Sequence, residues 1–194
     1  MPRVIAGSAG GRRLQTLRGD HTRPTADRVK EALFSSLGDV GGLVVLDLFA
    51  GSGGLGIEAL SRGAAAAVLV EHNRQAVALI RDNLRTAAVE ATATVVASTV
   101  QAFCRQPLGG PFDVVFVDAP YAIGLSVLAA DLAQLITAQA LQPGARVILE
   151  RDRRREEDVP TFLSHDHDRA YGDTLLRYFT HHPNQNAAEG APTP

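Results

Sequence analysis

Short apolar segments alternate with helical patterns along the chain from about residue 42 onward. Continuous apolar runs of strand length predict buried strands at residues 43–49, 65–71, 93–97, 112–118 and 146–150. Helical patterns lie between them at residues 55–62, 73–88 and 126–137, with Asn73 as the predicted cap of the second helix and Asn83 on its packed face. Two parallel strands cannot be joined by a tight turn, so a parallel sheet needs crossover helices of this kind. The alternation therefore predicts an α/β fold with a doubly wound, mostly parallel sheet.

The beginning of the chain departs from this alternation. Residues 3–6 and 13–17 are two short segments joined by a glycine-rich loop, and a short amphipathic helix follows a predicted N-cap at Thr25. We interpret residues 1–40 as a basic extension that is too small to fold alone. We expect it to pack against the sheet near the strand ends where ligands bind.

The main domain is predicted to span residues 41–180, closed by antiparallel strands within residues 170–180. Residues 181–194 offer no apolar face to bury, so we expect a disordered tail there. Three polar segments are interpreted as turns: Pro143-Gly144 before a strand, the His/Asp residues 165–168, and the YGDT sequence at 171–174. In the last of these, Asp173 and Thr174 are expected to bond the local backbone.

Composition excludes some classes of protein. At 194 residues, with 45% hydrophobic and 21% charged residues, the chain is typical of one globular domain. Its apolar runs are much shorter than the roughly 20 residues of a membrane-spanning helix, and its N-terminus lacks the apolar core of a signal peptide. The single cysteine, Cys104, cannot form an internal disulfide. We therefore expect a cytoplasmic protein rather than a membrane or disordered one.

Charge is unevenly distributed, although the net charge is only −2. Residues 1–30 hold seven basic residues against two acidic ones, so this part carries +5 and the remainder −7. A basic arm of this kind is suited to neutralising nucleic-acid phosphates. A solvated polar arm would explain the same charge, and charge alone leaves both interpretations open.

A glycine-rich loop follows the first strand, in the sequence DLFAGSGGLG from Asp47 to Gly56. Gly51, Gly53 and Gly56 form the spacing GxGxxG, and Glu71 follows Gly51 by 20 residues at the end of the next strand. Glycines let the backbone approach a ligand closely, and a carboxylate at the second strand end can accept both ribose hydroxyls. The pattern predicts a cofactor that contains a nucleoside.

Asp47 favours one class of cofactor over another. A carboxylate four residues before Gly51 would repel the pyrophosphate of a dinucleotide. It would attract the ammonium and sulfonium groups of S-adenosylmethionine. A buried Asp that only caps the glycine turn remains the structural alternative.

The sequence Asp118-Ala119-Pro120-Tyr121 follows another predicted strand. The carboxyl ends of neighbouring parallel strands meet in one crevice, so this motif should lie beside the glycine loop. Asp118 and the Ala119 carbonyl can accept two N–H bonds from the exocyclic amine of a base, and Tyr121 can stack on its ring. Such a site would act through positioning and electrostatics, without a metal.

With these motifs the chain resembles the class I S-adenosylmethionine-dependent methyltransferases that methylate amino groups. It is more closely similar to the RsmD-type guanine-N2 methyltransferases of bacterial 16S rRNA. RVIAGSAGGRR at 3–13, TRPTADRVKEALF at 22–34, the two core motifs and YGDT at 171–174 occur in the family's order. The resemblance implies a Rossmann-like, seven-stranded methyltransferase fold with a short N-terminal hairpin and helix. It also implies methyl transfer to the N2 amine of one guanine in the small ribosomal subunit.

The resemblance implies roles for individual residues as well. The cofactor S-adenosylmethionine would be held by Asp47, Gly51, Ser52, Gly53, Glu71, Ser98 and Thr99. The target base would be held by Asp118, Ala119, Pro120 and Tyr121. Phosphates of the rRNA would be contacted by Arg12, Arg13, Arg23 and Arg28. We expect a monomer without a metal, acting on 16S rRNA in a 30S subunit or an assembly intermediate.

One residue departs from the family pattern, and two other functions remain as alternatives. Ala119 stands where the family has proline, so the carbonyl acceptor is retained but the stiffening ring is lost. The first alternative is a non-catalytic RNA-binding or ribosome-assembly factor on a methyltransferase scaffold. The second is a dinucleotide-dependent oxidoreductase that uses the same glycine loop.

Overall fold

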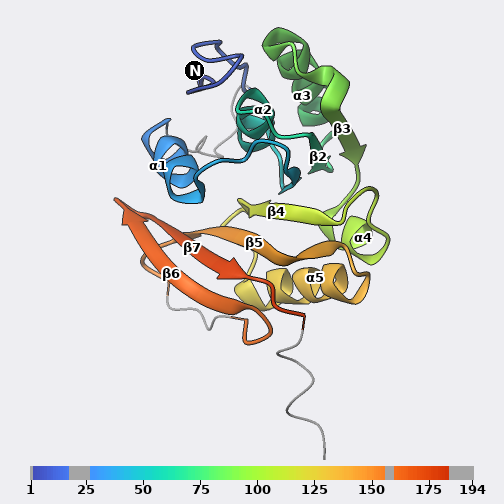
Figure 1. Ribbon diagram of the computed structural model, residues 1–194, viewed down its shortest axis with the longest axis vertical. Helices are drawn as coiled ribbons and strands as arrows, with labels where there is room; N and C mark the ends of the chain where they lie inside the picture. The colour runs from blue at the N-terminus through green and yellow to red at the C-terminus, as the bar shows by residue number, and fades with distance from the viewer. Residues whose placement is uncertain (1, 18–26, 156–159, 184–194) are drawn as a thin grey trace, which may run out of the picture.

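A computed structural model describes residues 2–17, 27–155 and 160–183 of the chain. Seven strands form one sheet in the order β3-β2-β1-β4-β5-β7-β6 (Figure 1). The strands are β1 (Val44–Leu48), β2 (Ala66–Glu71), β3 (Ala93–Ala97), β4 (Phe112–Val117), β5 (Leu141–Asp152), β6 (Ser164–Tyr171) and β7 (Thr174–Thr180). Strands β1 to β5 pair in parallel, whereas β7 runs antiparallel to both β5 and β6. This is the class I methyltransferase fold, and it confirms the predicted fold class.

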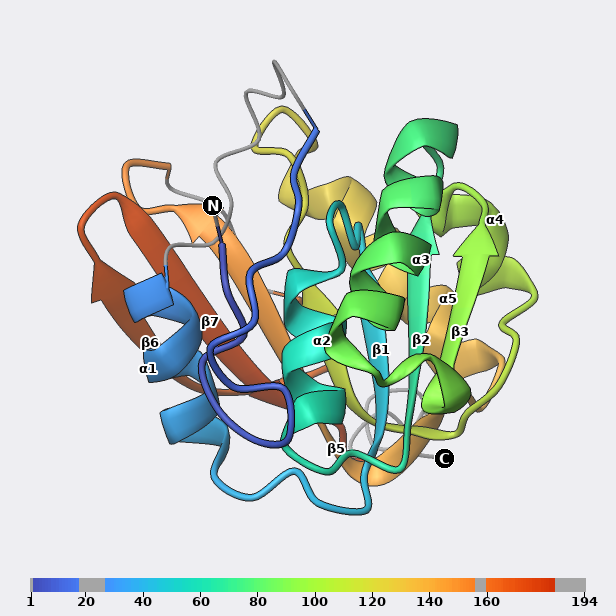
Figure 2. The same ribbon diagram turned by 90° about the horizontal axis from the view of Figure 1, so that it is seen from above.

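Helices cover both faces of the sheet, as Figures 1 and 2 show. They are α1 (Asp27–Leu37), α2 (Gly54–Ser61), α3 (Arg74–Ala87), α4 (Val100–Arg105) and α5 (Leu125–Thr137), with a short 3-10 turn, η1 (Glu90–Thr92). Helices α1, α2 and α3 lie on one face and α4 and α5 on the other. Successive side chains of a strand point to opposite faces. Accordingly Val45 belongs to the core under α1–α3, and Leu46 and Leu48 belong to the core under α4 and α5.

The N-terminal extension packs mainly on α2. A β-bridge between Arg3 and Arg13 closes the glycine-rich loop, and Ser8 N donates to the carbonyl of Ser61 over 2.7 Å. Gly7 has a φ of 82° and lies so close to Ser61 that a side chain there would overlap its carbonyl. Ser61 ends α2, so this loop lies at the end of the sheet opposite to the carboxyl ends of the strands (Figure 2). The expectation that the extension packs at the ligand-binding edge is therefore wrong for residues 7–11.

Glu58 of α2 joins the extension, α1 and α2 at one point. Its fully buried carboxylate accepts hydrogen bonds from Ile5 N at 2.7 Å, Ala6 N at 3.1 Å and Arg62 Nε at 2.8 Å. The Lys30 ammonium of α1 lies 3.4 Å from the same carboxylate and is also buried. Burial lowers the pKa of Lys30, and the charge of Glu58 opposes that shift. Four donors on one carboxylate thus hold residues 5 and 6 of the extension against α1 and α2.

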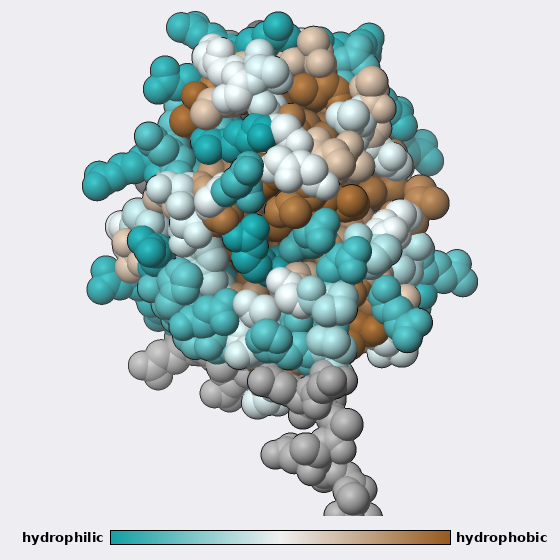
Figure 3. Space-filling view, in the orientation of Figure 1, coloured by the Kyte–Doolittle hydropathy of each residue, from teal (hydrophilic) through white to brown (hydrophobic). Residues whose placement is uncertain are grey.

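Two of the predicted turns are parts of strands. Pro143 and Gly144 lie inside β5, where the pairing with β4 shifts register between Phe112 and Val114. Residues 165–168 belong to β6, the outermost strand, which pairs with β7 through its backbone. An edge strand with solvent-exposed side chains needs no apolar alternation, and charge on it discourages edge-to-edge association. Figure 3 shows this lower part of the molecule as largely hydrophilic.

The start of the predicted disordered tail is wrong, because His181 is buried and its N donates to Ala145 O over 2.8 Å. Arg23, Thr25 and residues 184–194 fall outside the described residues. Within the described ranges, no helix has the length and apolar character to cross a membrane. Within the same ranges, no group of three or more His, Cys, Asp or Glu side chains is placed to hold a metal ion.

Glu58→Ala should destabilise the fold strongly. The substitution leaves the Lys30 ammonium buried without its carboxylate and removes the acceptor for Ile5 N and Ala6 N. Removing one partner of a buried ion pair costs about 3–5 kcal/mol. Urea unfolding measures this free energy, with Glu90→Ala at an exposed position as the control, expected within about 0.5 kcal/mol of the parent. A loss below about 1 kcal/mol for Glu58→Ala would contradict the role of this carboxylate.

Candidate active site

The glycine loop connects β1 to α2 through three residues of positive φ. These are Phe49 at 62°, Gly51 at 56° and Gly53 at 82°. Ala50 N donates to Val70 O of β2 over 3.0 Å, and Gly53 N donates to Ala50 O over 2.7 Å. Glycine adopts positive φ without strain, whereas Phe49 holds an unfavourable conformation that its surroundings must impose. The backbone thus turns sharply at the carboxyl end of β1.

Asp47 lies beneath this loop. Strand alternation places it on the α2 side of the sheet, where its Oδ2 accepts a hydrogen bond from Gly56 N over 2.8 Å. Its side chain is almost completely buried. Burial raises the pKa of Asp47 to about 7, the bond from Gly56 opposes this, and the charges of Asp118 and Glu71 add to it. Asp47 therefore caps the glycine turn, which was the structural alternative. Its contact with a cofactor stays a prediction.

Glu71 links the loop to the next strand end. Its Oε2 accepts from Gly51 N over 3.0 Å, and its Oε1 accepts from Asn73 N over 2.7 Å. Its carbonyl accepts from Ser98 N over 3.1 Å, which places the end of β3 beside it. Asn73 caps α3, as the sequence predicted, with its side chain accepting from Gln75 N and Ala76 N. The structure thus brings Gly51, Glu71 and Ser98 to one edge of the sheet.

Two other predicted cofactor residues make local contacts. Thr99 caps α4 by accepting from Ala102 N over 3.2 Å. The Ser52 carbonyl accepts a bond of 2.9 Å from Asn83 Nδ2. Asn83 is fully buried on α3, and it also exchanges two hydrogen bonds with the backbone of Gln15. Sequence reasoning missed this role of Asn83, which it interpreted only as part of the packed face of α3.

The second motif lies beside the first, because β4 pairs with β1 and Val117 is opposite Leu48. Asp118 comes next in the chain. Ala119 is buried, and the following turn is closed by Ile123 N donating to Pro120 O over 2.9 Å. Burial raises the pKa of the Tyr121 hydroxyl. The two motifs therefore end at the same edge of the sheet.

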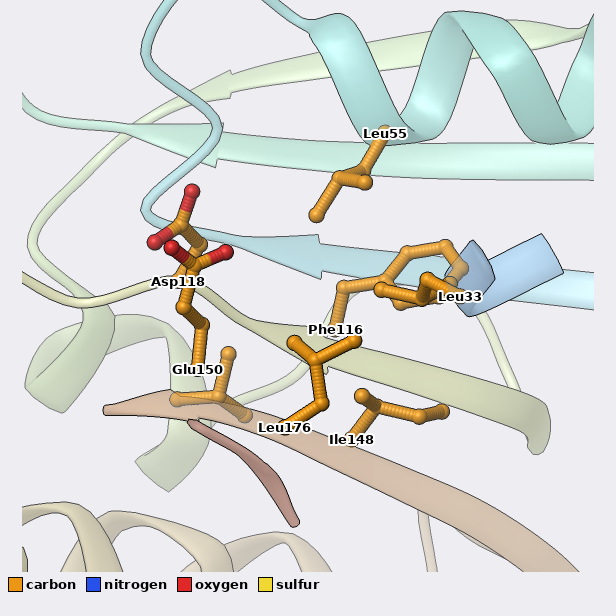
Figure 4. Close-up of a pocket in the computed structure, with 8 residues that line it drawn as sticks. Leu33, Leu55, Phe116, Asp118, Ile148, Glu150 and Leu176 are labelled. Atoms are coloured by element: carbon orange, nitrogen blue, oxygen red, sulfur yellow. The ribbon is translucent and has the colours of Figure 1, made fainter. Parts of the chain in front are cut away.

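A narrow gap lies between these elements (Figure 4), and its apolar lining residues are buried in the core. Its lining residues are Leu33, Leu55, Phe116, Val117, Asp118, Ile148, Glu150 and Leu176. The carboxylates of Asp118 and Glu150 lie near one another at one end of the gap, and apolar side chains form the rest. Sequence reasoning missed Glu150, although its position at the end of a predicted strand was a usable signal.

The predicted RNA-binding arginines that the structure describes lie on different segments of the chain. Arg12 donates from Nη1 to the carbonyl of Thr86 over 2.7 Å, at the last turn of α3. Arg13 is exposed in the bridge to Arg3, and Arg28 is exposed on α1. Arg23 lies outside the described residues. Their contacts with RNA stay predictions.

Comparison with known proteins identifies the family. Residues 2–180 match the model of the family described as Conserved hypothetical protein 95. The chain belongs to this family. As the motifs predicted, this is the RsmD-type family: the chain is 38% identical over 161 residues to “Ribosomal RNA small subunit methyltransferase D” of Haemophilus influenzae, covering 81% of this chain and 82% of that protein. The protein of the same name in Escherichia coli is 44% identical over 127 residues, 63% of this chain and 62% of its own length.

Solved structures agree with this membership. One described as “Putative methyltransferase yhhF from Escherichia coli” has a TM-score of 0.81 and 35% sequence identity, covering 94% of this chain and 98% of that one. The N-terminal extension and the closing β6–β7 pair therefore belong to the shared architecture of the RsmD-type family. They are not additions of this chain.

Gly56→Ala tests the contact between α2 and β1. An added Cβ would meet Leu69 Cδ2 at 2.8 Å and Asp47 Oδ2 at 3.2 Å. We expect a loss of about 1–3 kcal/mol in the free energy of unfolding, measured in urea. Gly54→Ala is the matched control, because a Cβ there meets only Ser52 Oγ at 4.0 Å. Equal effects of the two substitutions would contradict the close packing at Gly56.

Stability should depend on pH through Asp47. The folded chain holds this proton up to about pH 7, whereas the unfolded chain releases it near its ordinary value of 3.8. Between these values unfolding releases a proton, so Asp47 lowers stability by about 1.4 kcal/mol per pH unit as pH rises, and its effect levels off above about pH 7.

Asp47→Asn removes that contribution. The free energy of unfolding of the variant, measured in urea, should therefore rise relative to that of the parent between about pH 5 and about pH 8. If the free energies of unfolding of parent and variant differ by the same amount at these two pH values, the pKa of Asp47 is not raised.

Proposed function

We propose that this chain transfers a methyl group from S-adenosylmethionine to the exocyclic N2 amine of a guanine in 16S rRNA. The observation that carries the proposal is the position of Asp118-Ala119-Pro120-Tyr121 beside the glycine loop in a member of the RsmD-type family. Its relatives are named for methylation of small-subunit rRNA. In the proposed arrangement, the cofactor and the base would lie next to one another at a single edge of the sheet.

The residues present fit this cofactor. The charges of Asp118 and Glu71 both act on Asp47, so three carboxylates share the edge around the loop. Such an edge attracts a ligand with ammonium and sulfonium groups, and binding would lower the pKa of Asp47 again. It repels a pyrophosphate, which argues against the dinucleotide-dependent oxidoreductase. When bound, S-adenosylmethionine supplies an electrophilic methyl group on its sulfonium.

Other cofactor contacts follow from residues at the same edge. Glu71 already accepts two backbone N–H groups, and a carboxylate has about four acceptor positions, so it can also accept ribose hydroxyls. Gly51 has open space where a side chain would stand, since an added Cβ would meet only Phe49 O at 3.9 Å. A ligand can therefore approach the backbone of Gly51 closely, and the Ser52 and Gly53 contacts stay predictions. Ser98 and Thr99 would lie beside the adenine.

The second motif would position the base. Asp118 accepts one N2–H bond and the Ala119 carbonyl accepts the other, which directs the nitrogen lone pair toward the methyl donor. As the new N–C bond forms and the S–C bond breaks, the amine loses one proton, and Asp118 is placed to accept it. Tyr121 would offer a ring for stacking on the base.

Ala119 would keep the carbonyl acceptor without the family's proline. Its side chain is buried in the core under α4 and α5, and the bond from Ile123 N to Pro120 O closes the turn. Packing and this hydrogen bond supply stiffness that a proline ring would otherwise give. These features support an active enzyme over a non-catalytic assembly factor on the same scaffold.

The partner we propose is 16S rRNA within a 30S subunit or an assembly intermediate, in the cytoplasm, with the protein acting as a monomer. Arg12, Arg13, Arg23 and Arg28 would supply contacts to phosphates. Residues 1–40 would act as an extension of the domain at 41–180, because Glu58 and Asn83 both hold it in place.

Incubation with labelled S-adenosylmethionine and undermodified 30S subunits tests the function. We expect label in 16S rRNA at one guanine, located by mass spectrometry. Asp118→Ala should lower the rate of methyl transfer at least about 100-fold. The substitution removes the group that positions the N2 amine and accepts its proton. The affinity for S-adenosylhomocysteine, measured by calorimetry, should stay within about threefold of the parent.

Asp82→Ala, at an exposed position on α3, is the control and should retain full activity. Unchanged turnover in Asp118→Ala would remove Asp118 from the mechanism. Absence of label from rRNA with the parent protein would reject the function, as would tight binding of a nicotinamide dinucleotide without binding of S-adenosylhomocysteine.

A further inference from the structure

We propose that Asn83 of α3 is a positioning residue for S-adenosylmethionine: it fixes one peptide of the glycine loop, and the backbone of Gln15 fixes Asn83 in turn. The N-terminal extension thereby contributes to cofactor binding through the loop. This inference rests on the proposed function and deepens it, because it names what holds the loop ready for the cofactor.

The side-chain amide of Asn83 is completely buried and makes three hydrogen bonds. Its Oδ1 accepts from Gln15 N over 2.8 Å, and its Nδ2 donates to Gln15 O over 3.0 Å. The same Nδ2 donates to Ser52 O over 2.9 Å. A primary amide has two N–H donors, so both are used. One side chain therefore joins the extension, α3 and the glycine loop.

Gln15 determines which way this amide faces. Its backbone N–H meets the oxygen of Asn83, and its carbonyl meets the nitrogen. A reversed amide would set its oxygen against the carbonyl oxygens of Gln15 and Ser52, and its nitrogen against a backbone N–H. Buried polar groups without a partner are costly, so the reversed amide is disfavoured. The extension thus keeps one N–H of Asn83 directed at Ser52.

The peptide between Ser52 and Gly53 is held at both of its polar atoms. Its carbonyl accepts from Asn83, and its N–H donates to Ala50 O over 2.7 Å. Gly53 has a φ of 82°, and glycine adopts either sign of φ at little cost, so this residue does not fix the peptide by itself. The bond from Asn83 therefore opposes rotation of the peptide from the α3 side.

The extension does not depend on Asn83 alone for its attachment. Residues 5 and 6 bond to Glu58, and Arg12 Nη1 donates to Thr86 O over 2.7 Å. These contacts hold the extension on α2 and α3. The Asn83 amide is what extends the attachment to the glycine loop, where the cofactor is proposed to bind.

Loss of the bond from Asn83 would let the loop populate other orientations. Only molecules whose loop has the cofactor-binding orientation bind tightly, so the apparent Kd rises as their fraction falls. Saturating cofactor restores the same bound state, so the maximal rate is retained. A residue that acts in this way changes KM for S-adenosylmethionine and leaves kcat nearly unchanged.

Asn83→Leu tests the contact from α3. Leucine has the same branched shape and suits a buried position, but it donates no hydrogen bond to Ser52. Calorimetry should give an affinity for S-adenosylhomocysteine about 5- to 100-fold below that of the parent, the range for a lost buried hydrogen bond whose acceptor is left unpaired. With 30S subunits as substrate, KM for S-adenosylmethionine should rise by a similar factor, and kcat should stay within about threefold.

Leu135→Ala is the control for an effect of stability. Leu135 is fully buried on α5, in the core on the other face of the sheet, so its truncation leaves a cavity far from the loop. The free energy of unfolding of this variant, measured in urea, should fall, whereas its affinity for S-adenosylhomocysteine should stay within about twofold of the parent. Equal losses of affinity in Leu135→Ala and Asn83→Leu would show that stability alone is responsible, and would overturn the inference.

Two substitutions at Gln15 test the contact from the extension. Gln15→Pro removes the N–H that bonds to Asn83 Oδ1, and should lower the affinity for S-adenosylhomocysteine about 3- to 10-fold. Gln15→Ala changes only an exposed side chain and retains the N–H, so it should keep the parent affinity. Parent affinity in Gln15→Pro would overturn the role of the extension.

Failure of the inference can be told apart from failure of the proposed function. If the parent binds S-adenosylhomocysteine but labels no rRNA, methylation of 16S rRNA is rejected, and the affinities of the variants still decide the role of Asn83. Parent affinity in both Asn83→Leu and Gln15→Pro overturns the inference and leaves the function standing. A parent that binds no S-adenosylhomocysteine overturns both.

Discussion

The hydrogen bond from Gly56 N to Asp47 Oδ2 determines where α2 begins relative to the sheet. It joins a residue inside β1 to the first turn of the helix, so the loop between them must turn sharply over a buried carboxylate. Positive φ angles at Phe49, Gly51 and Gly53 are the backbone consequence. Glu71 then holds the same loop from the neighbouring strand. The cofactor side of the site depends on these two carboxylates.

Acidic groups at this edge carry an electrostatic cost that the fold itself does not need. The pKa of Asp47 is raised to about 7 by burial and by the charges of Asp118 and Glu71, and Glu150 adds another acid at the end of β5. A cation bound at this edge would lower the cost of the charge on Asp47.

The N-terminal extension is held by two buried side chains of the main domain, Glu58 on α2 and Asn83 on α3. Glu58 fastens residues 5 and 6 to α1 and α2, away from the ligand-binding edge. Asn83 joins Gln15 to the carbonyl of Ser52, inside the glycine loop. The extension therefore runs from the amino-terminal side of the sheet up to the cofactor loop (Figure 2). A change in the position of Gln15 has a direct route to the loop through one buried amide.

The sequence by itself determined the α/β class, the glycine loop with Asp47 and Glu71, the Asp118 motif and the cap at Asn73. These depend on patterns within a few residues, or on the rule that parallel strands end at one edge. Only the tertiary structure decided that Glu58 and Asn83 hold the extension, that residues 165–168 form an edge strand, and that Glu150 lines the same narrow gap as Asp118. Each of these rests on contacts between residues far apart in the chain. Burial and strand order create such contacts, and no local pattern of residue types records them.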